Sequence, residues 1–239
     1  MIETMNLWPF RKRVSLQDSG IFSGFTDWHS HILPGVDDGV RTMGESLEIL
    51  RLYEELGVRS VWLTPHIMED IPNTTAHLRE RFAELQASYS GRVELHLAAE
   101  NMLDGLFEER LEKNDLLPLG ENGDHLLVET SFFSPPMDLY GILERIKAKG
   151  YHPVLAHPER YGYMEKEEYR RIKDMGVKLQ LNLFSIVGAY GKHIQEKAEQ
   201  LLKFGVYDLI GSDLHSEKSG TTYSRKLMTN KIRRNILTI

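Results

Sequence analysis

The amino-acid sequence predicts an α/β protein whose mostly parallel strands form a barrel, and three observations support this fold class. A glycine followed by a short β-rich run recurs five times along the chain. Helical patterns separate most of the strands, which should therefore be parallel and joined by right-handed crossovers. No glycine-rich phosphate or dinucleotide loop follows the first strand. This favours a closed or distorted barrel over the alternative, an open doubly wound sheet.

Seven strands are expected in total. Before five of them, a glycine can end the preceding helix in the left-handed conformation, and a short β-rich run follows it. An opening strand and the apolar run that ends at Glu129 complete the set. The expected strands cover residues 25–31, 57–63, 91–97, 125–129, 150–156, 176–182 and 205–211.

The segments between these strands carry apolar residues at helical spacing. Thr42 and Glu45 match a capping box, which marks the start of a helix, and an apolar stripe follows from Ile49 to Leu56. Similar apolar patterns predict helices within residues 78–89, 139–146 and 191–204.

Composition limits the class of protein. A chain of 239 residues with 41% hydrophobic and 27% charged residues is typical of a soluble globular protein. A formal net charge of −6 argues against a nucleic-acid binder that relies on bulk charge, although it does not exclude a local basic patch. The lack of cysteine excludes disulfides, thiolate zinc sites and the cysteine-dependent phosphatases and proteases.

We expect one domain over residues 24–239, preceded by an N-terminal appendage at residues 1–23. The basic run at residues 11–13 is too short to indicate an acidic partner and is expected to be a solvated face. The aromatic pieces at residues 8–10 and 21–22 are expected to cover part of the domain. Neither a signal peptide nor a stretch of transmembrane length is found in the sequence, so the cytoplasm is the expected location.

Residues that can bind metal follow six of the seven expected strands. His29 and His31 are two positions apart on the opening strand, so their side chains point to the same face. Because the carboxyl ends of parallel strands converge on one face of a barrel, the side chains at these ends should meet. The remaining strand ends at Asn182, which can support the site by hydrogen bonding. The nine candidate ligands are His29, His31, Asp38, His66, Glu100, Glu129, His157, Asp213 and His215.

These nine residues are of the types that bind divalent ions, because neutral imidazoles and carboxylates are their usual ligands. Nine ligands are too many for one ion and suit two or three ions that share bridging carboxylates. For any single residue the alternative is an ordinary hydrogen-bonded group at a strand end. For the whole set this alternative is weak, because buried unpaired charges are costly.

Four short motifs resemble the polymerase-and-histidinol-phosphatase (PHP) family of metal-dependent phosphoesterases. They are most similar to its branch of bacterial tyrosine-protein phosphatases from capsule and exopolysaccharide operons, the CpsB/YwqE group. The resemblance spans about residues 25–216. It rests on His-Ser-His-Ile-Leu-Pro-Gly-Val-Asp-Asp-Gly at 29–39, Thr-Pro-His at 64–66, His-Pro-Glu-Arg-Tyr at 157–161 and Ser-Asp-Leu-His at 212–215.

This resemblance implies a PHP-type distorted (β/α)7 barrel with a trinuclear metal site. It implies that all nine candidates bind metal, with manganese as the expected ion and iron, zinc or magnesium as alternatives. It also implies that Arg160 binds the phosphate. The family commonly carries an asparagine and then a second phosphate-binding arginine after the last ligand, and this sequence differs there. Lys218 and Arg225 are considered as substitutes.

The chemistry of such a site agrees with a phosphatase. Three divalent ions and the four carboxylates sum to 6 − 4 = +2, which suits a phosphate-monoester dianion. A water shared by two ions would be a hydroxide near neutral pH, placed for in-line attack on phosphorus. Arg160 would add a bidentate clamp on the phosphoryl oxygens. A tyrosine leaving group has a pKa near 10, so it needs less protonation than serine, and the sequence does not identify a general acid.

The resemblance therefore implies a metal-dependent protein-tyrosine phosphatase. Its implied partner is a tyrosine autokinase that controls capsular or exopolysaccharide synthesis, which would bring the protein to the inner face of the membrane. One alternative is a PHP phosphatase for a small metabolite such as histidinol phosphate. An amidohydrolase is less consistent, because none of the strand ends carries the lysine that this class often uses. A metal-binding regulatory module without turnover is the alternative from a different class.

Overall fold

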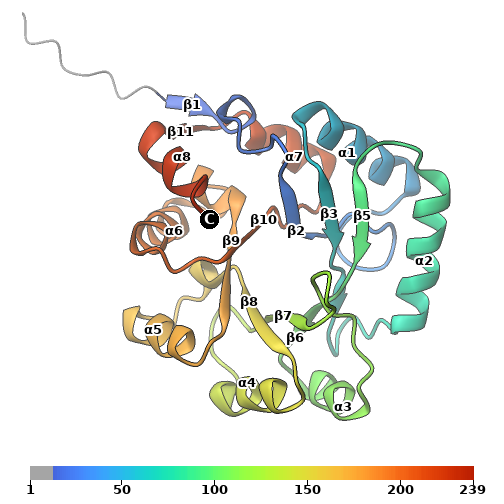
Figure 1. The fold of residues 1–239 in the computed structure, drawn as a ribbon, viewed down its shortest axis with the longest axis vertical. Helices are drawn as coiled ribbons and strands as arrows, with labels where there is room; N and C mark the ends of the chain where they lie inside the picture. Colours follow the sequence, from blue (N-terminus) through green and yellow to red (C-terminus); the bar gives the residue numbers. More distant parts are fainter. Residues whose placement is uncertain (1–12) are drawn as a thin grey trace, which may run out of the picture.

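The structure is a computed structural model, and it describes residues 13–239. Its central strands are all parallel and form a curled sheet with the helices on the outside (Figure 1). These strands are β2 (Thr26–Ser30), β3 (Ser60–Leu63), β4 (His66–Ile67), β5 (Glu94–Leu97), β6 (Glu100–Met102), β7 (His125–Glu129), β8 (His152–Ala156), β9 (Lys178–Asn182) and β10 (Leu209–Gly211).

The sheet has two hydrogen-bonded parts. One part has the strand order β10-β9-β8-β7-β6-β4 and the other has the order β2-β3-β5. Where the chain leaves β10, the backbone N–H of His31 donates to the carbonyl of Leu214 at 2.9 Å, and that of Asp213 donates to His29 at 2.8 Å. These bonds bring the end of β2 beside the segment that follows β10. The architecture is a mixed α/β domain with a curled, half-barrel parallel sheet.

Each of the seven expected strands is present, but two of them continue into a second short strand that the sequence did not predict. Pro65 interrupts the chain between β3 and β4, because proline has no N–H to donate to a ladder. Its carbonyl instead accepts from the N–H of Glu100 at 3.1 Å. The interruption lets β4 pair with β6 in the register that sets His66 directly beside Glu100.

Eight helices are present in the described part of the chain. The capping box at Thr42 and Glu45 is confirmed, and Gly57 ends the same helix with a φ of 87°. Four of the helices, α1, α2, α4 and α6, correspond to the stretches expected from apolar spacing. The eight are α1 (Met43–Leu56), α2 (Thr75–Ser88), α3 (Gly105–Lys113), α4 (Leu139–Ala148), α5 (Lys166–Asp174), α6 (Lys192–Phe204), α7 (Glu217–Ser224) and α8 (Asn230–Ile236).

Three short 3-10 helices complete the elements: η1 (Gln17–Ser19), η2 (Pro158–Arg160) and η3 (Leu183–Val187). Within residues 13–239, no helix combines the length and the apolar character that a membrane crossing requires.

The two ends of the described chain pair with each other. Strand β1 (Arg13–Ser15) and strand β11 (Leu227–Thr229) are antiparallel neighbours (Figure 1). Ile21 and Phe22 are buried in the core, as expected for that aromatic piece, and Leu16 is buried with them. The other aromatic piece at residues 8–10, together with Arg11 and Lys12, lies outside the described residues. The division of the chain after residue 23 stays a prediction.

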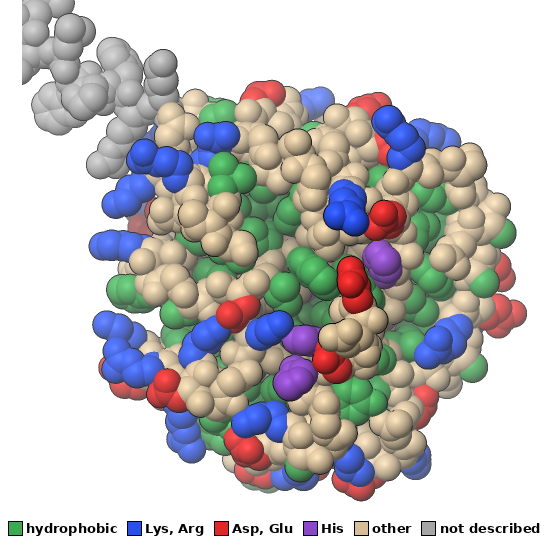
Figure 2. Space-filling model, in the orientation of Figure 1, with side chains coloured by type: hydrophobic (Ala, Val, Ile, Leu, Met, Phe, Trp, Pro, Cys, Tyr) green, Lys and Arg blue, Asp and Glu red, His purple; other side chains and the backbone are tan. Residues whose placement is uncertain are grey.

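Basic side chains are concentrated on the surface where the two ends of the described chain pair. Lys and Arg side chains gather along the left margin of the molecule in Figure 2, on the side of β1, α6 and α8. Arg13 and Lys203 line a groove of about 840 Å³ there with Lys226, Lys231 and Arg234. A local basic patch is thus present on a chain with a net charge of −6.

Leu143 on α4 provides a test of the core away from the strand ends. Its side chain is fully buried in the main apolar cluster. We expect Leu143→Ala to lower the free energy of unfolding by about 2–5 kcal/mol, through lost transfer energy and the cavity left behind. The exposed neighbour Glu144 gives a matched control, and Glu144→Ala should change stability by less than about 0.5 kcal/mol. Urea unfolding of both variants measures this difference, and equal stability would contradict the assignment of this core.

Candidate metal centre

The strand ends bring the nine expected ligands together. His29 and His31 come from the end of β2, and His66 and Glu100 begin β4 and β6 side by side. The others lie at the ends of four strands: Asp38 follows β2, Glu129 ends β7, His157 follows β8, and Asp213 and His215 follow β10. Eight of the nine form three overlapping groups whose ligand atoms lie within 4.8 Å of one another. These groups are His31, Asp38, His66 and His215; His29, His31, Glu100 and Asp213; and His66, Glu100 and Glu129.

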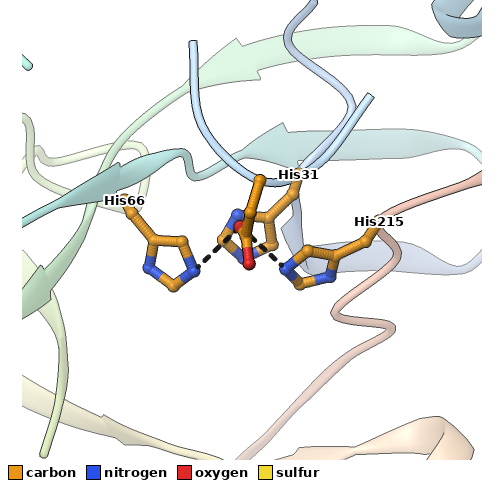
Figure 3. Close-up of side chains that lie close together, drawn as sticks. His31, His66 and His215 are labelled. Carbon is orange, nitrogen blue, oxygen red and sulfur yellow. Dashed lines mark ion pairs between the residues drawn. The ribbon is translucent and has the colours of Figure 1, made fainter. Parts of the chain in front are cut away.

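The first group lies nearest to solvent. His66 and His215 stand on either side of His31 (Figure 3). His31 follows β2, His66 begins β4 and His215 follows β10. One carboxylate oxygen of Asp38 lies 3.5 Å from Nε2 of His66 and 3.5 Å from Nε2 of His215. The contact with His215 is the main cause that lowers the pKa of Asp38 to about 2, while burial acts in the opposite direction. Asp38 is therefore ionised near neutral pH.

The second group surrounds one buried oxygen of Glu100. Its Oε2 atom lies 3.1 Å from Nε2 of His29, 3.2 Å from Nε2 of His31 and 3.2 Å from Nδ1 of His66. On the other side, Oδ1 of Asp213 lies 3.3 Å from Nε2 of His31. A single carboxylate oxygen that faces three imidazole nitrogens is arranged as a bridging ligand would be.

The third group adds Glu129, whose Oε1 lies 3.0 Å from Nδ1 of His66. His157 is the one expected ligand outside the three groups. Its Nε2 nevertheless lies 2.9 Å from Oε1 of Glu100 and 3.8 Å from Oε2 of Glu129. All nine expected ligands thus share one cluster, which is buried except at Asp38 and His215.

The cluster leaves several buried polar atoms without hydrogen bonds. Within the described residues, these include Oε2 of Glu100, Oε1 of Glu129, Nδ1 of His66 and Nδ1 of His157. An unsatisfied buried polar atom costs about 1–3 kcal/mol, so an arrangement with several of them at one place needs another partner. Oxygen and nitrogen lone pairs that face one another fit divalent cations between them.

Neighbouring residues orient three of the imidazoles, and the sequence reading missed two of these neighbours. Oε1 of Gln180 lies 2.8 Å from Nδ1 of His29, and a carboxylate oxygen of Asp37 lies 2.8 Å from Nδ1 of His31. The backbone carbonyl of Asp213 lies 2.9 Å from Nδ1 of His215. When Nδ1 carries the proton in each ring, Nε2 keeps a lone pair that points into the cluster.

Both missed residues carried a signal in the sequence. Asp37 is the first residue of the carboxylate pair, of which only Asp38 was selected as a ligand. Gln180 lies two positions before Asn182 on the same strand and therefore on the same face. Alternation along β9 would have predicted both polar side chains on the site face.

Two buried carboxylates of the cluster, Glu100 and Asp213, are held in their ionised form. Burial raises the pKa of Glu100, but the adjacent imidazoles of His29 and His66 outweigh this effect and keep the pKa well below its usual range. At Asp213, burial also raises the pKa, but the nearby charge of His29 lowers it by more, so the pKa of Asp213 is below its usual value. Ionised carboxylates give the cluster the negative charge that divalent cations would balance.

Two of the expected ligands have unusual backbone conformations. His157 has a φ of 32° and Asp213 has a φ of 53°, both in the left-handed region. Such conformations cost about 1–3 kcal/mol for residues other than glycine and are concentrated at functional sites. At both positions the strained backbone turns the side chain toward the cluster within two residues of a strand end.

Arg160 lies beside the cluster at the end of η2. Its Nη1 donates to Oδ2 of Asp213 at 2.9 Å. The guanidinium is held between two aromatic rings, 4.2 Å from the ring centre of Phe132 and 4.3 Å from that of Tyr190. Asn182, which was expected to support the site, also donates to Oδ2 of Asp213, at 2.8 Å. The sequence reading did not identify Phe132 or Tyr190.

A cavity of about 450 Å³ opens over the cluster. Lys218 and Arg225, which were considered as second phosphate contacts, are exposed and are not among the residues that line it. Its lining combines seven of the expected ligands with Arg160 and with aromatic and methionine side chains. Those other side chains are Met68, Met102, Phe132, Phe184, Tyr190 and Tyr223.

Comparison with known proteins connects this geometry to one family. A family model described as capsular polysaccharide synthesis, CpsB/CapC, matches residues 25–235. Tyrosine-protein phosphatase YwqE of Bacillus subtilis is 27% identical over 208 residues, which cover 84% of this chain and 82% of that protein. Tyrosine-protein phosphatase CpsB of Streptococcus pneumoniae is 29% identical over 213 residues, covering 84% of this chain and 86% of the relative.

A solved structure has the same fold. It is described as belonging to YwqE from Bacillus subtilis and CpsB from Streptococcus pneumoniae, unique metal-dependent tyrosine phosphatases. The two chains superpose with a TM-score of 0.76 at 26% sequence identity, and the match covers 89% of this chain and 86% of the other.

Proposed function

The chain belongs to the CpsB/CapC family of capsular polysaccharide synthesis, and from this premise we propose that it is a metal-dependent protein-tyrosine phosphatase. The observation that supports this most is the buried cluster of imidazoles and carboxylates with unpaired atoms, next to an arginine, at the floor of one cavity. The family relatives named above are tyrosine-protein phosphatases, and one of their structures is described as metal-dependent.

We propose that the nine clustered residues bind two or three divalent ions, with manganese as the expected metal. The unpaired atoms of Glu100, Glu129 and His66 support this set, since each would gain a partner, and Nε2 of His157 lies 2.9 Å from Oε1 of Glu100. Bound ions would offset the charge of a phosphate monoester and activate water as a nucleophile at neutral pH. We also propose that the curled sheet is a distorted (β/α)7 barrel of the PHP type, because the ligands follow successive strands as that fold requires.

Arg160 has the role of a phosphate clamp in this proposal. Its aromatic neighbours, Phe132 and Tyr190, limit the movement of the guanidinium, so less side-chain entropy is lost when it binds a phosphoryl group. The bond to Asp213 uses Nη1 and leaves other N–H donors for phosphoryl oxygens. The positive charge of Arg160 would stabilise the phosphoryl group more strongly in the transition state than in the bound substrate, because negative charge develops there.

The walls of the cavity support an aryl phosphate as the substrate. Phe184 and Tyr223 line the cavity in contact with each other at 5.4 Å between ring centres, and Phe132 and Tyr190 lie by Arg160. An aromatic wall gains more from a tyrosine ring than from the polar histidinol side chain. Rates on a phosphotyrosine peptide, a phosphoserine peptide and histidinol phosphate test this choice. Comparable kcat/KM on all three would leave the substrate assignment without support.

The physiological partner is a further part of the proposal. A tyrosine autokinase of capsular or exopolysaccharide synthesis would supply phosphotyrosine and would bring the phosphatase to the inner face of the membrane. The family description supports the connection with capsular polysaccharide. Co-purification of the kinase with an Asp213→Asn variant, and its release by orthovanadate, would support this partner, whereas equal recovery with an unphosphorylated kinase would contradict it.

Metal removal should abolish the activity. We expect a strong chelator to reduce hydrolysis of a phosphotyrosine peptide to background, and added manganese or a similar ion to restore it. Thiol alkylation should have no effect, because the chain contains no cysteine. Activity and metal content measured on the same samples provide the check. Full activity in metal-free protein would contradict both the phosphatase mechanism and the ligand set, and stoichiometric metal without any turnover would favour the regulatory module.

A further inference from the structure

The two most exposed large hydrophobic side chains of residues 13–239 lie in one short loop. Phe133 is 91% exposed and Met137 is fully exposed, while the other exposed large hydrophobic residues reach at most 56%. A single exposed apolar residue is ordinary on a protein surface. Phe133 and Met137 are only four positions apart, and almost the whole of each side chain is in solvent. Together they form a small exposed apolar patch that a partner can cover.

Hydrogen bonds hold both ends of the loop that carries Phe133 and Met137. It connects β7 to α4. At its start, the N–H of Thr130 donates to the hydroxyl of Tyr161 at 3.2 Å, and the N–H of Gly162 donates to the carbonyl of Phe132 at 3.2 Å. At its end, Asp138 caps α4 through the N–H of Gly141 at 3.2 Å.

Two prolines stiffen the middle of the loop. Pro135 and Pro136 each fix φ near −65° and remove backbone freedom between Phe133 and Met137. A restrained loop loses less conformational entropy on binding than a flexible one, so a contact made there contributes more to affinity. Methionine adapts its shape to different apolar partners, and phenylalanine gives a large contact area.

The loop is continuous with the candidate metal centre. It follows directly after Glu129, one of the expected ligands, and Phe132 within it lines the cavity and faces Arg160. The next residue, Phe133, points out to solvent. One loop therefore carries an aromatic side chain toward the cavity and two apolar side chains toward solvent.

We propose that Phe133 and Met137 bind the polypeptide next to the phosphotyrosine and make the enzyme prefer apolar residues at the flanking positions. This inference rests on the proposed phosphatase function and adds a substrate preference to it. The occupant is a segment of the phosphoprotein substrate, because only a chain attached to the residue in the cavity must pass this loop. Burial of both side chains against apolar flanks should raise kcat/KM by about tenfold or more over polar flanks.

Three probes test the preference with the manganese-loaded enzyme. These are free phosphotyrosine, the acetylated and amidated peptide Ala-Leu-phosphotyrosine-Leu-Ala, and the same peptide with serine in place of each leucine. The leucine peptide should have a kcat/KM about tenfold above that of the serine peptide, with the difference mainly in KM. Free phosphotyrosine reports on the metal centre without any flanking residue.

The double variant Phe133→Ser with Met137→Ser should reduce the ratio of leucine to serine peptide from about ten to near one. The matched control is Phe204→Ser with Leu237→Ser, which removes two half-exposed apolar residues that do not line the cavity, at 52% and 51% exposure. This control should keep the wild-type ratio. Thermal unfolding of both double variants checks that each is folded.

The rates on the three probes distinguish failure of the inference from failure of the phosphatase function. Equal rates of the wild-type enzyme on both peptides overturn the inference and leave the phosphatase function in place. The same holds when the double variant keeps the tenfold ratio, or when it loses as much activity on free phosphotyrosine as on the leucine peptide. A wild-type enzyme that hydrolyses none of the three probes overturns the phosphatase function and this inference together.

Discussion

Asp213→Asn is expected to lower kcat on a phosphotyrosine peptide by about 10³-fold or more and to reduce the metal content of the purified protein. The carboxylate lies between His29 and His31, with Oδ1 at 3.5 and 3.3 Å from their Nε2 atoms. Asparagine has the same shape and also tolerates the left-handed backbone of this position, where φ is 53°. The substitution therefore removes the charge, the metal affinity and the ion pair with Arg160, while the shape of the side chain is kept.

A control for this variant lies at the other end of β10. Asp208 precedes β10, forms an ion pair with Lys173 at 2.5 Å and takes no part in the cluster. Asp208→Asn should keep the metal content and the kcat of the wild type. Metal analysis and kinetics on the same preparations separate the two variants. An Asp213→Asn protein that is inactive but fully loaded with metal would contradict the ligand assignment and point to a role as catalytic base.

Arg160→Ala is expected to lower kcat/KM by about 10²–10³, which corresponds to roughly 2.7–4 kcal/mol of transition-state stabilisation. Arg160→Lys should recover only part of this loss, because lysine keeps the charge but loses the planar fork that the aromatic neighbours hold in place. Metal content should not change. Asp213 would lose one donor, but its Oδ2 still accepts from Asn182 at 2.8 Å and from Tyr190 at 3.1 Å.

Arg145 provides the matched control for the clamp. It is 40% exposed on α4 and pairs with Glu108 and Asp138 at the surface. Arg145→Ala should change kcat/KM less than twofold, since surface pairs contribute little. Steady-state kinetics on a phosphotyrosine peptide compare all three variants. A near wild-type kcat/KM for Arg160→Ala would refute the clamp, and Lys218 and Arg225 would be tested next.

The order of strands and helices could be predicted from the sequence because each unit carries a local signal. The capping box at Thr42 and the helix-ending glycine at Gly57 are features of a few neighbouring residues, and both are present in the structure. The polar strand ends were predictable for a similar reason. An ionisable residue such as Glu100 or His157 directly after an apolar run stands out from packing residues, and parallel topology then brings these positions together.

Features that depend on distant partners could not be predicted in this way. The roles of Gln180 and Asp37 follow from the ring orientation of His29 and His31, which depends on the packed backbone. The interruption of the sheet at Pro65 could be suspected, but the new pairing of His66 with Glu100 depends on where the neighbouring strand also breaks. The aromatic pair around Arg160 joins two loops that are far apart in the sequence.

The pairing of β1 with β11 has a consequence for the synthesis of the protein. The guanidinium of Arg233 donates to the carbonyl of Ser19 across 214 residues, next to the antiparallel pair that joins the two strands. A ribosome releases the chain from the N-terminus, so Leu16, whose N–H donates to the carbonyl of Lys226 at 3.0 Å, gains this partner only after residue 226 has emerged. Completion of this part of the domain is thus delayed until β11 has emerged, and a nascent chain that stops before β11 keeps apolar surface exposed to chaperones and proteases.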